Sequence, residues 1–140
     1  MPAPLRTPDE LIAVLHAAFP PANPDTAVRI EELDDTTIRM RAPIGDRPPL
    51  RPGNTVSGPA LFSFADAVAW MLTLAHLESG RDAVTSGVTM QFLRRPQPVD
   101  LVGEGRLLRM GRRLSVTDVL LFSAGTDDPV AQATVTYAPI

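Results

Sequence analysis

One carboxylate in this sequence stands out because of its surroundings. Asp66 is the only acidic residue between Asp46 and Glu78, and apolar residues flank it, with Phe62 and Trp70 about one helical turn away on either side. A buried carboxylate is costly unless partners stabilise its charge. Asp66 is therefore either a structural aspartate that caps a backbone or pairs with an arginine, or a group that acts on a bound molecule.

The remaining composition narrows the possible chemistry. The 140 residues include no cysteine, and all 13 basic residues are arginines. Thiolate nucleophiles, cysteine-ligated metals, Schiff-base lysines and Walker-type phosphate lysines are therefore excluded. His16 and His76 are too few for a histidine-rich metal site. With a net charge of −3, sequence-independent binding to nucleic acid is not expected either. We expect carboxylates, hydroxyls, backbone amides and arginines to carry any reaction.

Three residues at the predicted start of a helix precede this carboxylate. Ser57 suits the N-cap, and Pro59 fits the first turn, where its missing N–H costs nothing. Capping therefore accounts for two of the three residues. The Gly58 N–H is left over, and the positive end of the helix would help it to hydrogen-bond a developing oxyanion.

Two helices are predicted around these residues. A capping box at residues 7–10 begins the first helix, and prolines at positions 20 and 21 end it. The second helix runs from residue 58 to about residue 79, with Gly80 as its C-cap. Apolar residues on every side indicate that it is buried all round, and Asp66 argues against a membrane span.

The other segments predict strands. Residues 28–33 and 36–41 alternate apolar and polar side chains around an Asp34-Asp35 turn, which indicates a hairpin. Residues 43–58 are rich in proline and glycine and predict a functional loop. Four more strands are predicted at residues 83–93, 101–109, 114–123 and 130–137. This order indicates a single α+β domain, residues 1–140, with an antiparallel sheet around a long central helix.

Several motifs, in this order, resemble the hotdog-fold thioesterases of the PaaI type. That family has the pattern G-T-V-H-G-G with an aspartate nine positions after the histidine. Here the segment reads N-T-V-S-G-P-A-L-F-S-F-A-D, with Ser57 and Asp66 nine apart. V-T-M-Q-F-L-R-R-P at residues 88–96 resembles the central strand of the family, and residues 100–104, 111–114 and 130–137 resemble its last three strands. The resemblance spans residues 28–137.

The resemblance implies a fold, a reaction and an assembly. It implies an N-terminal helix and linker over residues 1–24, followed by a hotdog core over residues 25–138. It implies hydrolysis of an acyl-CoA thioester without a metal or cofactor, with Asp66 as nucleophile or general base and the Gly58 N–H polarising the thioester carbonyl. Sites of the family form between two subunits, so a homodimer or a dimer of dimers is implied.

Three positions depart from the family motif. Ser57 stands where the family has a histidine that helps to position the thioester, and Pro59 replaces the second glycine. Arg51 stands where many relatives have an asparagine, and it would pair with Asp66 or bind a substrate carboxylate or a CoA phosphate. In the same loop, Asn54 is a candidate to position water.

Other candidates for substrate binding lie in this loop and on the predicted strands. Thr55 belongs to the binding loop, and Ser86 lies where relatives carry a polar residue near the thioester, although a locally bonded sheet hydroxyl is the simpler interpretation. Three arginines, Arg94, Arg95 and Arg113, together with the adjacent Arg112, would receive CoA phosphates, although charged strand ends are usually only solvated.

Two alternatives to hydrolysis remain open. The chain would be an acyl-CoA-binding protein if its altered loop no longer supports turnover. An acyl-thioester hydratase or dehydratase is less favoured, because that chemistry needs a histidine near the start of the helix and His76 lies ten positions after Asp66. Phe62, Phe64 and Trp70 would line an aromatic or a medium aliphatic acyl pocket. Residues 1–7 lack the pattern of a signal peptide, so a cytoplasmic location without a membrane partner is expected.

Overall fold

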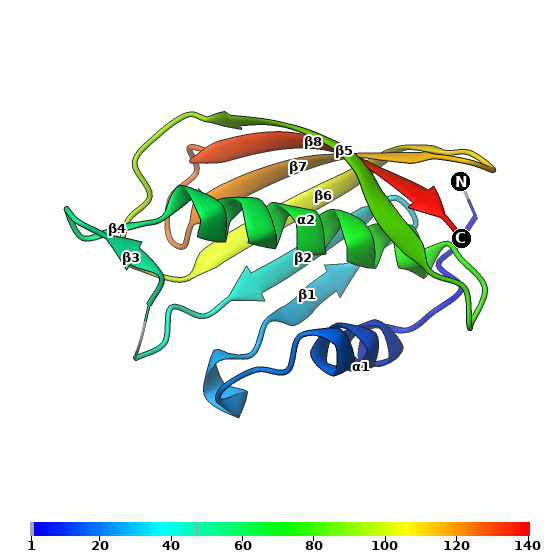
Figure 1. The fold of residues 1–140 in the computed structure, drawn as a ribbon, viewed down its shortest axis with the longest axis horizontal. Coiled ribbons are helices and arrows are strands. Elements are labelled where there is room, and N and C mark those ends of the chain that lie inside the picture. The colour runs from blue at the N-terminus through cyan, green and yellow to red at the C-terminus, as the bar shows by residue number, and fades with distance from the viewer. Residues whose placement is uncertain (1, 47) are drawn as a thin grey trace.

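A six-stranded sheet and one long helix form most of the molecule (Figure 1). The computed structural model describes residues 2–46 and 48–140. Its elements are α1 (Pro8–Ala18), a short 3-10 helix η1 (Pro24–Thr26), β1 (Arg29–Leu33), β2 (Thr37–Ala42), β3 (Leu50–Arg51), β4 (Thr55–Val56), α2 (Gly58–Ala75), β5 (Ala83–Phe92), β6 (Leu101–Met110), β7 (Ser115–Ser123) and β8 (Ala131–Pro139). The strand order in the large sheet is β1-β2-β6-β7-β8-β5, and every neighbouring pair is antiparallel.

The central helix α2 lies across one face of this sheet and packs against β2, β5, β6, β7 and β8 (Figure 1). Two glycines of β6 permit the close approach. A Cβ atom at Gly103 would lie 2.8 Å from a methyl group of Val68, and one at Gly105 would lie 2.9 Å from the other methyl group of that residue. Both distances are too short for ordinary packing. The helix therefore lies this close to β6 only because glycine, which has no side chain, occupies both positions.

The first helix begins as its sequence predicts. Thr7 Oγ1 accepts a hydrogen bond from the Glu10 N–H at 3.2 Å, and the Glu10 carboxylate accepts one from the Thr7 N–H at 3.1 Å. Leu11 and Leu15 are buried, and the helix packs against α2 and β1. In Figure 1, α1 lies beside β1 at the edge of the sheet.

The predicted strands are confirmed to within one or two residues at each end, and the predicted α+β class is confirmed as well. Two details differ from the prediction. The loop over residues 43–58 contains the small β3–β4 hairpin. The central helix ends at Ala75 rather than at residue 79, because the N–H groups of His76 and Leu77 bond three residues back, to the carbonyls of Thr73 and Leu74. His76 is thus the C-cap, and Gly80 lies in the following turn with a φ of +87°.

The prediction that α2 is buried all round is wrong between Phe62 and Trp70. Phe62 is 43% exposed, Ser63 is exposed, and Asp66, Ala67 and Trp70 are half-buried. By length and composition alone this helix could cross a membrane, but 61% of that 18-residue window is buried within the fold. Most of its apolar residues therefore pack against the sheet that surrounds the helix.

Candidate active site

Asp66 lies on the half-exposed side of α2 and is held by two hydroxyl groups. The Tyr137 hydroxyl donates to Asp66 Oδ1 at 2.6 Å, and the Thr85 hydroxyl donates to the same oxygen at 2.9 Å. Within residues 2–46 and 48–140, the other carboxylate oxygen, Oδ2, accepts no hydrogen bond, and no arginine or histidine forms an ion pair with Asp66. The observed partners of this carboxylate are therefore two neutral hydroxyl groups, and not the arginine that was one of the expected partners.

The sheet brings these two hydroxyls together from separate strands. Thr85 on β5 is directly opposite Tyr137 on β8, and the pairing shifts register between Thr85 and Gly87, so that Ser86 is the extra residue of a bulge. A bulge bends its strand and re-aims the neighbouring side chains. In Figure 1, the first part of β5 curves over α2, in agreement with the hydrogen bond from Thr85 of this strand to Asp66 of the helix.

Burial keeps the Tyr137 hydroxyl protonated. The residue is 4% exposed. This burial, together with the nearby Asp66 carboxylate that accepts a hydrogen bond from the hydroxyl, raises the pKa of Tyr137 far above its ordinary value. Its hydroxyl therefore remains a hydrogen-bond donor throughout the pH range in which the folded protein would work.

A cavity of about 660 Å³ opens beside Asp66. Its walls come from α1 and the segment after it, from the half-exposed side of α2 and from the ends of several strands. Asp66 is the one carboxylate among the lining residues that the structure describes, and most of the others are apolar: Leu15, His16, Ala18, Phe19, Pro21, Thr26, Ala27, Val28, Ala42, Pro49, Ala60, Ser63, Phe64, Asp66, Ala67, Trp70, Ala83, Val84, Thr85, Leu101 and Tyr137. A carboxylate in a mostly apolar cavity is a typical arrangement of an active site.

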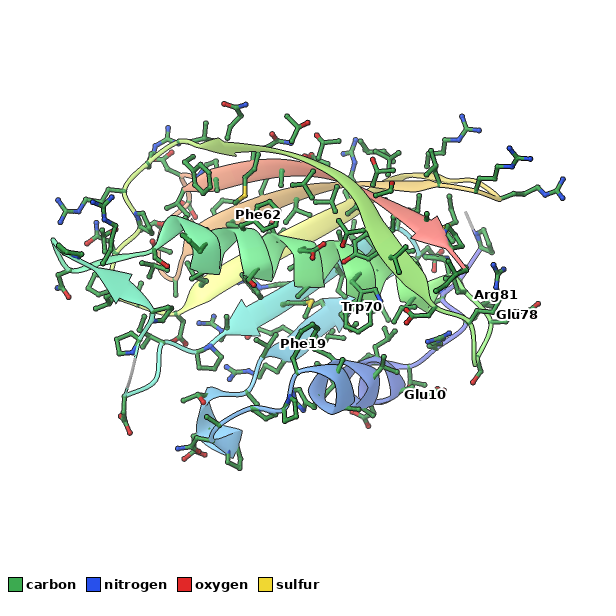
Figure 2. The ribbon with its side chains drawn as sticks, in the orientation of Figure 1. Glu10, Phe19, Phe62, Trp70, Glu78 and Arg81 are labelled. Carbon is green, nitrogen blue, oxygen red and sulfur yellow. The ribbon has the colours of Figure 1, made fainter. Side chains whose placement is uncertain are left out.

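Two aromatic side chains form one wall of this cavity. The rings of Phe19 and Trp70 meet edge to face with centroids 6.2 Å apart, and Figure 2 shows them adjacent, one after α1 and the other on α2. The Trp70 indole N–H donates to Asp82 at 3.0 Å, which fixes the ring. Of the aromatic residues expected to line an acyl pocket, Phe64 and Trp70 do so, whereas Phe62 lies outside the lining.

The start of α2 has the capping structure that its sequence predicts. Ser57 Oγ accepts a hydrogen bond from the Ala60 N–H at 3.3 Å, so Ser57 is the N-cap. The Gly58 N–H has no acceptor among the residues that the structure describes. A Cβ atom at Gly58 would meet the Phe92 ring at 3.7 Å, an ordinary contact. A free, positively polarised N–H therefore lies at this end of the helix.

The residues predicted in the preceding loop lie apart from Asp66. Arg51 is exposed on β3, and the pairing of Arg51 with Asp66 foreseen as one option is absent from the described ion pairs. Asn54 occupies the hairpin turn with a φ of +58°, and the Thr55 hydroxyl donates to the Pro96 carbonyl at 2.7 Å. These side chains belong to the β3–β4 hairpin, and none of them lines the cavity beside Asp66.

The other predicted binding residues occupy two opposite ends of the sheet. Arg94 donates to the Pro129 carbonyl at 2.9 Å, and Arg95 donates to the Gly53 carbonyl. Both follow β5, whereas Arg113 is exposed in the turn between β6 and β7, and the strand pairings place that turn at the other end. The Ser86 hydroxyl donates to the Thr136 carbonyl at 3.4 Å, as the local interpretation predicts.

His76 also lies outside the cavity. As the C-cap of α2 it leaves Nε2 buried, with no hydrogen-bond partner among the residues described. Desolvation lowers the pKa of His76 below its ordinary value, although contact with Asp35 acts in the opposite direction. No group of three or more metal-ligating side chains occurs within residues 2–46 and 48–140.

Sequence reasoning missed Tyr137 and Thr85, the two residues that contact Asp66. Tyr137 is the only tyrosine of the chain and lies on the buried side of β8, where the alternating pattern of a strand gives no sign of a contact with Asp66. The bulge at Ser86 reverses which residue of β5 faces α2. The prediction therefore chose the residue next to the one that contacts the carboxylate.

An antiparallel sheet that wraps around a long central helix is the architecture of the hotdog fold. The chain belongs to the thioesterase superfamily, whose family model matches residues 53–130. The matched region includes Gly58, Asp66 and Thr85. The hotdog fold foreseen from the motifs is confirmed, while the narrower PaaI-type assignment stays a prediction.

Solved structures agree with this assignment. A candidate thioesterase from Silicibacter sp. TM1040 shares 41% identity over 98% of this chain and 94% of its own, with a TM-score of 0.86. A mutant thioesterase from Pseudomonas aeruginosa has 21% identity over 98% of this chain and 97% of its own, with a TM-score of 0.82. A hypothetical thioesterase from Streptococcus pneumoniae, solved with coenzyme A, has 21% identity over 80% of this chain and 87% of its own, with a TM-score of 0.70. Among proteins of curated function, no sequence matches this chain.

Proposed function

We propose that this protein hydrolyses acyl-CoA thioesters and that Asp66 is the reacting carboxylate. One observation carries the proposal: two hydroxyls fix Oδ1 of Asp66, and no described residue donates to Oδ2, beside a largely apolar cavity. An ionised oxygen that is oriented and free of hydrogen bonds is what a nucleophile or a general base requires. Membership of the thioesterase superfamily supports the same reaction.

Two routes lead to the same products. As a general base, Asp66 takes a proton from water while the water oxygen bonds to the thioester carbon; the C–S bond then breaks, and the thiolate of CoA takes up the proton. As a nucleophile, Asp66 bonds to the carbonyl carbon and expels the thiolate, and water then cleaves the resulting mixed anhydride. Either route consumes one water and releases a carboxylic acid and free CoA.

The oxyanion donor for this reaction comes from a second subunit. Gly58 and Asp66 are eight residues apart on one helix, which separates their Cα atoms by about 12 Å. A single carbonyl group contacted at about 3 Å by both an N–H and an attacking aspartate oxygen spans about 7 Å, and a water between the aspartate and the carbonyl adds about 3 Å. The separation therefore favours the Gly58 N–H of a second copy as the donor, and the resemblance to a family whose sites form between two subunits supports the same arrangement.

The two edges of the sheet indicate how the second copy binds. The β1 edge is short, carries a bulge and is rich in charge, because Glu31 pairs with Arg39 and Arg41 of β2. The β5 edge is ten residues long and largely exposed, and it carries apolar side chains: Val84 is 49% and Phe92 is 56% exposed. Long, uncharged edges usually pair with another strand. We therefore place β5 against β5 of a partner subunit, in a homodimer or a dimer of dimers.

The cavity defines the acyl group in general terms. Its lining is mostly apolar, and its volume of about 660 Å³ is within the range of pockets that hold drug-sized ligands. An apolar aryl or medium-chain acyl group fills such a space, whereas an acetyl group leaves most of it empty. The phosphates of CoA would meet exposed arginines, for which Arg51, Arg94 and Arg95 are candidates. The coenzyme A bound to the structural relative from Streptococcus pneumoniae supports this class of ligand.

An acyl-CoA-binding protein without turnover is the second candidate. The observation in its favour is that Ser57, which stands in place of the family histidine, uses its hydroxyl as an N-cap. Arg51 and Asn54 also lie outside the cavity. A hydratase or dehydratase is less favoured, because His76 does not line the cavity.

A thiol-release assay separates these candidates. Aryl, short-, medium- and long-chain acyl-CoA substrates are compared for the wild type, Asp66→Asn and the control Asp127→Asn, which removes an exposed carboxylate from a surface turn. We expect turnover of apolar acyl groups that falls by roughly 1,000-fold or more in Asp66→Asn and persists in Asp127→Asn. Binding of acyl-CoA measured by calorimetry, without thiol release from any substrate, would favour the binding protein.

A further inference from the structure

Both hydrogen bonds to the Asp66 side chain reach the same oxygen. Tyr137 lies 2.6 Å and Thr85 lies 2.9 Å from Oδ1, and the Tyr137 hydroxyl is also 3.2 Å from the Asp66 backbone carbonyl. The donors come from β8 and β5, two strands that are paired directly at this point. The carboxylate is therefore attached to the sheet through one oxygen, and its plane and rotamer are fixed.

We propose that Tyr137 and Thr85 are positioning residues that bind Oδ1 of Asp66 and direct Oδ2 toward the thioester. The inference rests on the proposed function, because it concerns the same carboxylate. It assigns a specific role to the buried hydroxyl of Tyr137 and to the exposed hydroxyl of Thr85.

The chemical type of the donors supports this role. An arginine would bind a carboxylate through both of its oxygens and neutralise its charge. Two hydroxyls on one oxygen stabilise the anion by hydrogen bonding but leave its net charge and its second oxygen available. A purely structural aspartate would gain more from the arginine, whereas a base or nucleophile gains more from the hydroxyls.

The surroundings of Tyr137 indicate that its hydroxyl has a specific purpose. The ring is buried, and phenylalanine would pack in the same space without the need to satisfy a hydroxyl group. Asp66 is its hydrogen-bond partner among the described residues. The other titratable groups near this carboxylate are Asp82, which precedes β5, and His16 of α1, which lines the same cavity.

Kinetics of matched variants test the role of each hydroxyl. Tyr137→Phe and Thr85→Val each delete one donor, Thr85→Ser keeps the hydroxyl, and Thr136→Val deletes a hydroxyl of β8 that does not contact Asp66. We expect the first two variants to lower kcat by about 10- to 100-fold with little change in KM. Thr85→Ser and Thr136→Val should stay close to the wild type.

These kinetics also separate the inference from the proposed function. Wild-type kcat in Tyr137→Phe, together with an inactive Asp66→Asn, would overturn the positioning role but leave the thioesterase function intact. An increase in KM alone would overturn it as well. A wild type without turnover on any acyl-CoA would instead remove the proposed function.

A measurement without substrate tests the contact itself. Tyr137 is the only tyrosine, so ¹³C-labelling at the tyrosine Cζ gives one NMR signal for this hydroxyl. At pH 7 we expect that signal to move in Asp66→Asn, which alters the acceptor of the Tyr137 hydroxyl, and to stay at its wild-type position in Asp82→Asn. An unmoved signal in Asp66→Asn would overturn the inference.

Discussion

The two halves of the central helix differ in what surrounds them. In the first half, residues 58–66, Phe62 and Ser63 are exposed and Asp66 is half-buried beside the cavity. In the second half, residues 67–75, the last five residues, from Met71 to Ala75, are completely buried. Figure 2 labels one exposed residue of the first half, Phe62, and Trp70 of the second half, which lies beside Phe19.

Under the proposed function, the difference assigns stability to one half of the helix and the reaction to the other. The second half is held by apolar packing and by a hydrogen bond of 2.7 Å between the hydroxyls of Thr73 and Ser115. This packing anchors the helix, so the first half can leave a carboxylate and a free N–H accessible. If this division is correct, substitutions in the first half should alter the reaction and substitutions in the second half should alter unfolding.

The largest effect is expected at the start of the first half. Gly58→Pro removes the N–H that lacks an acceptor, at a first helical position that admits proline and after the extended Ser57, which suits a residue before proline. It also adds a Cβ atom before Pro59, and the control Gly58→Ala adds the same atom. We expect kcat to fall by about 100- to 1,000-fold with little change in the melting temperature. Gly58→Ala keeps the N–H and is the matched control. Equal kinetics in the two variants would exclude an oxyanion role for this N–H.

A substitution in the second half should have the opposite pattern. Leu72→Ala deletes a completely buried side chain and should lower the free energy of unfolding by about 2–5 kcal/mol. Urea denaturation measures that loss, and an assay at low temperature measures kcat per folded molecule, which should stay near the wild-type value. A large loss of kcat in fully folded Leu72→Ala would show that the two halves are not separate in function.

A smaller effect is expected at the end of the second half. Burial lowers the pKa of His76, so between the folded and unfolded pKa values the unfolded chain binds more protons. Stability should therefore be complete above the unfolded value of about 6.5 and fall as the pH is lowered through the folded value. Urea unfolding at several pH values should show a steeper acid loss in the wild type than in His76→Gln. Equal slopes would contradict this assignment.

The sequence predicts the halves of α2 unequally. The N-cap at Ser57, the unusual carboxylate Asp66 and the order of the strands follow from local patterns, and all three are found in the structure. The exposed side of the first half could not be predicted, because an all-apolar helix does not reveal which side the sheet leaves open. The bulge at Ser86 could not be predicted either, since register depends on pairing between distant strands.

The same limit applies to the cavity. The sequence predicts the N-terminal helix but not its place beside the site, where His16 and Phe19 line the same cavity as Asp66. Arg51 was placed near the carboxylate by its spacing in the motif, whereas the short β3–β4 hairpin holds it elsewhere. Positions on one helix can be inferred from spacing, but contacts between separate elements depend on the packing of the whole domain.

A subunit-mixing experiment tests the central claim, that Asp66 and the Gly58 N–H act on one thioester from two different chains. Asp66→Asn and Gly58→Pro are each measured alone, then unfolded together, refolded as a mixture and assayed for thiol release. If the site is shared, each mixed dimer has one intact site, and an equal mixture recovers about a quarter of the wild-type activity. If both groups act within one chain, every site carries a lesion, and a mixture no more active than the single variants would contradict the account.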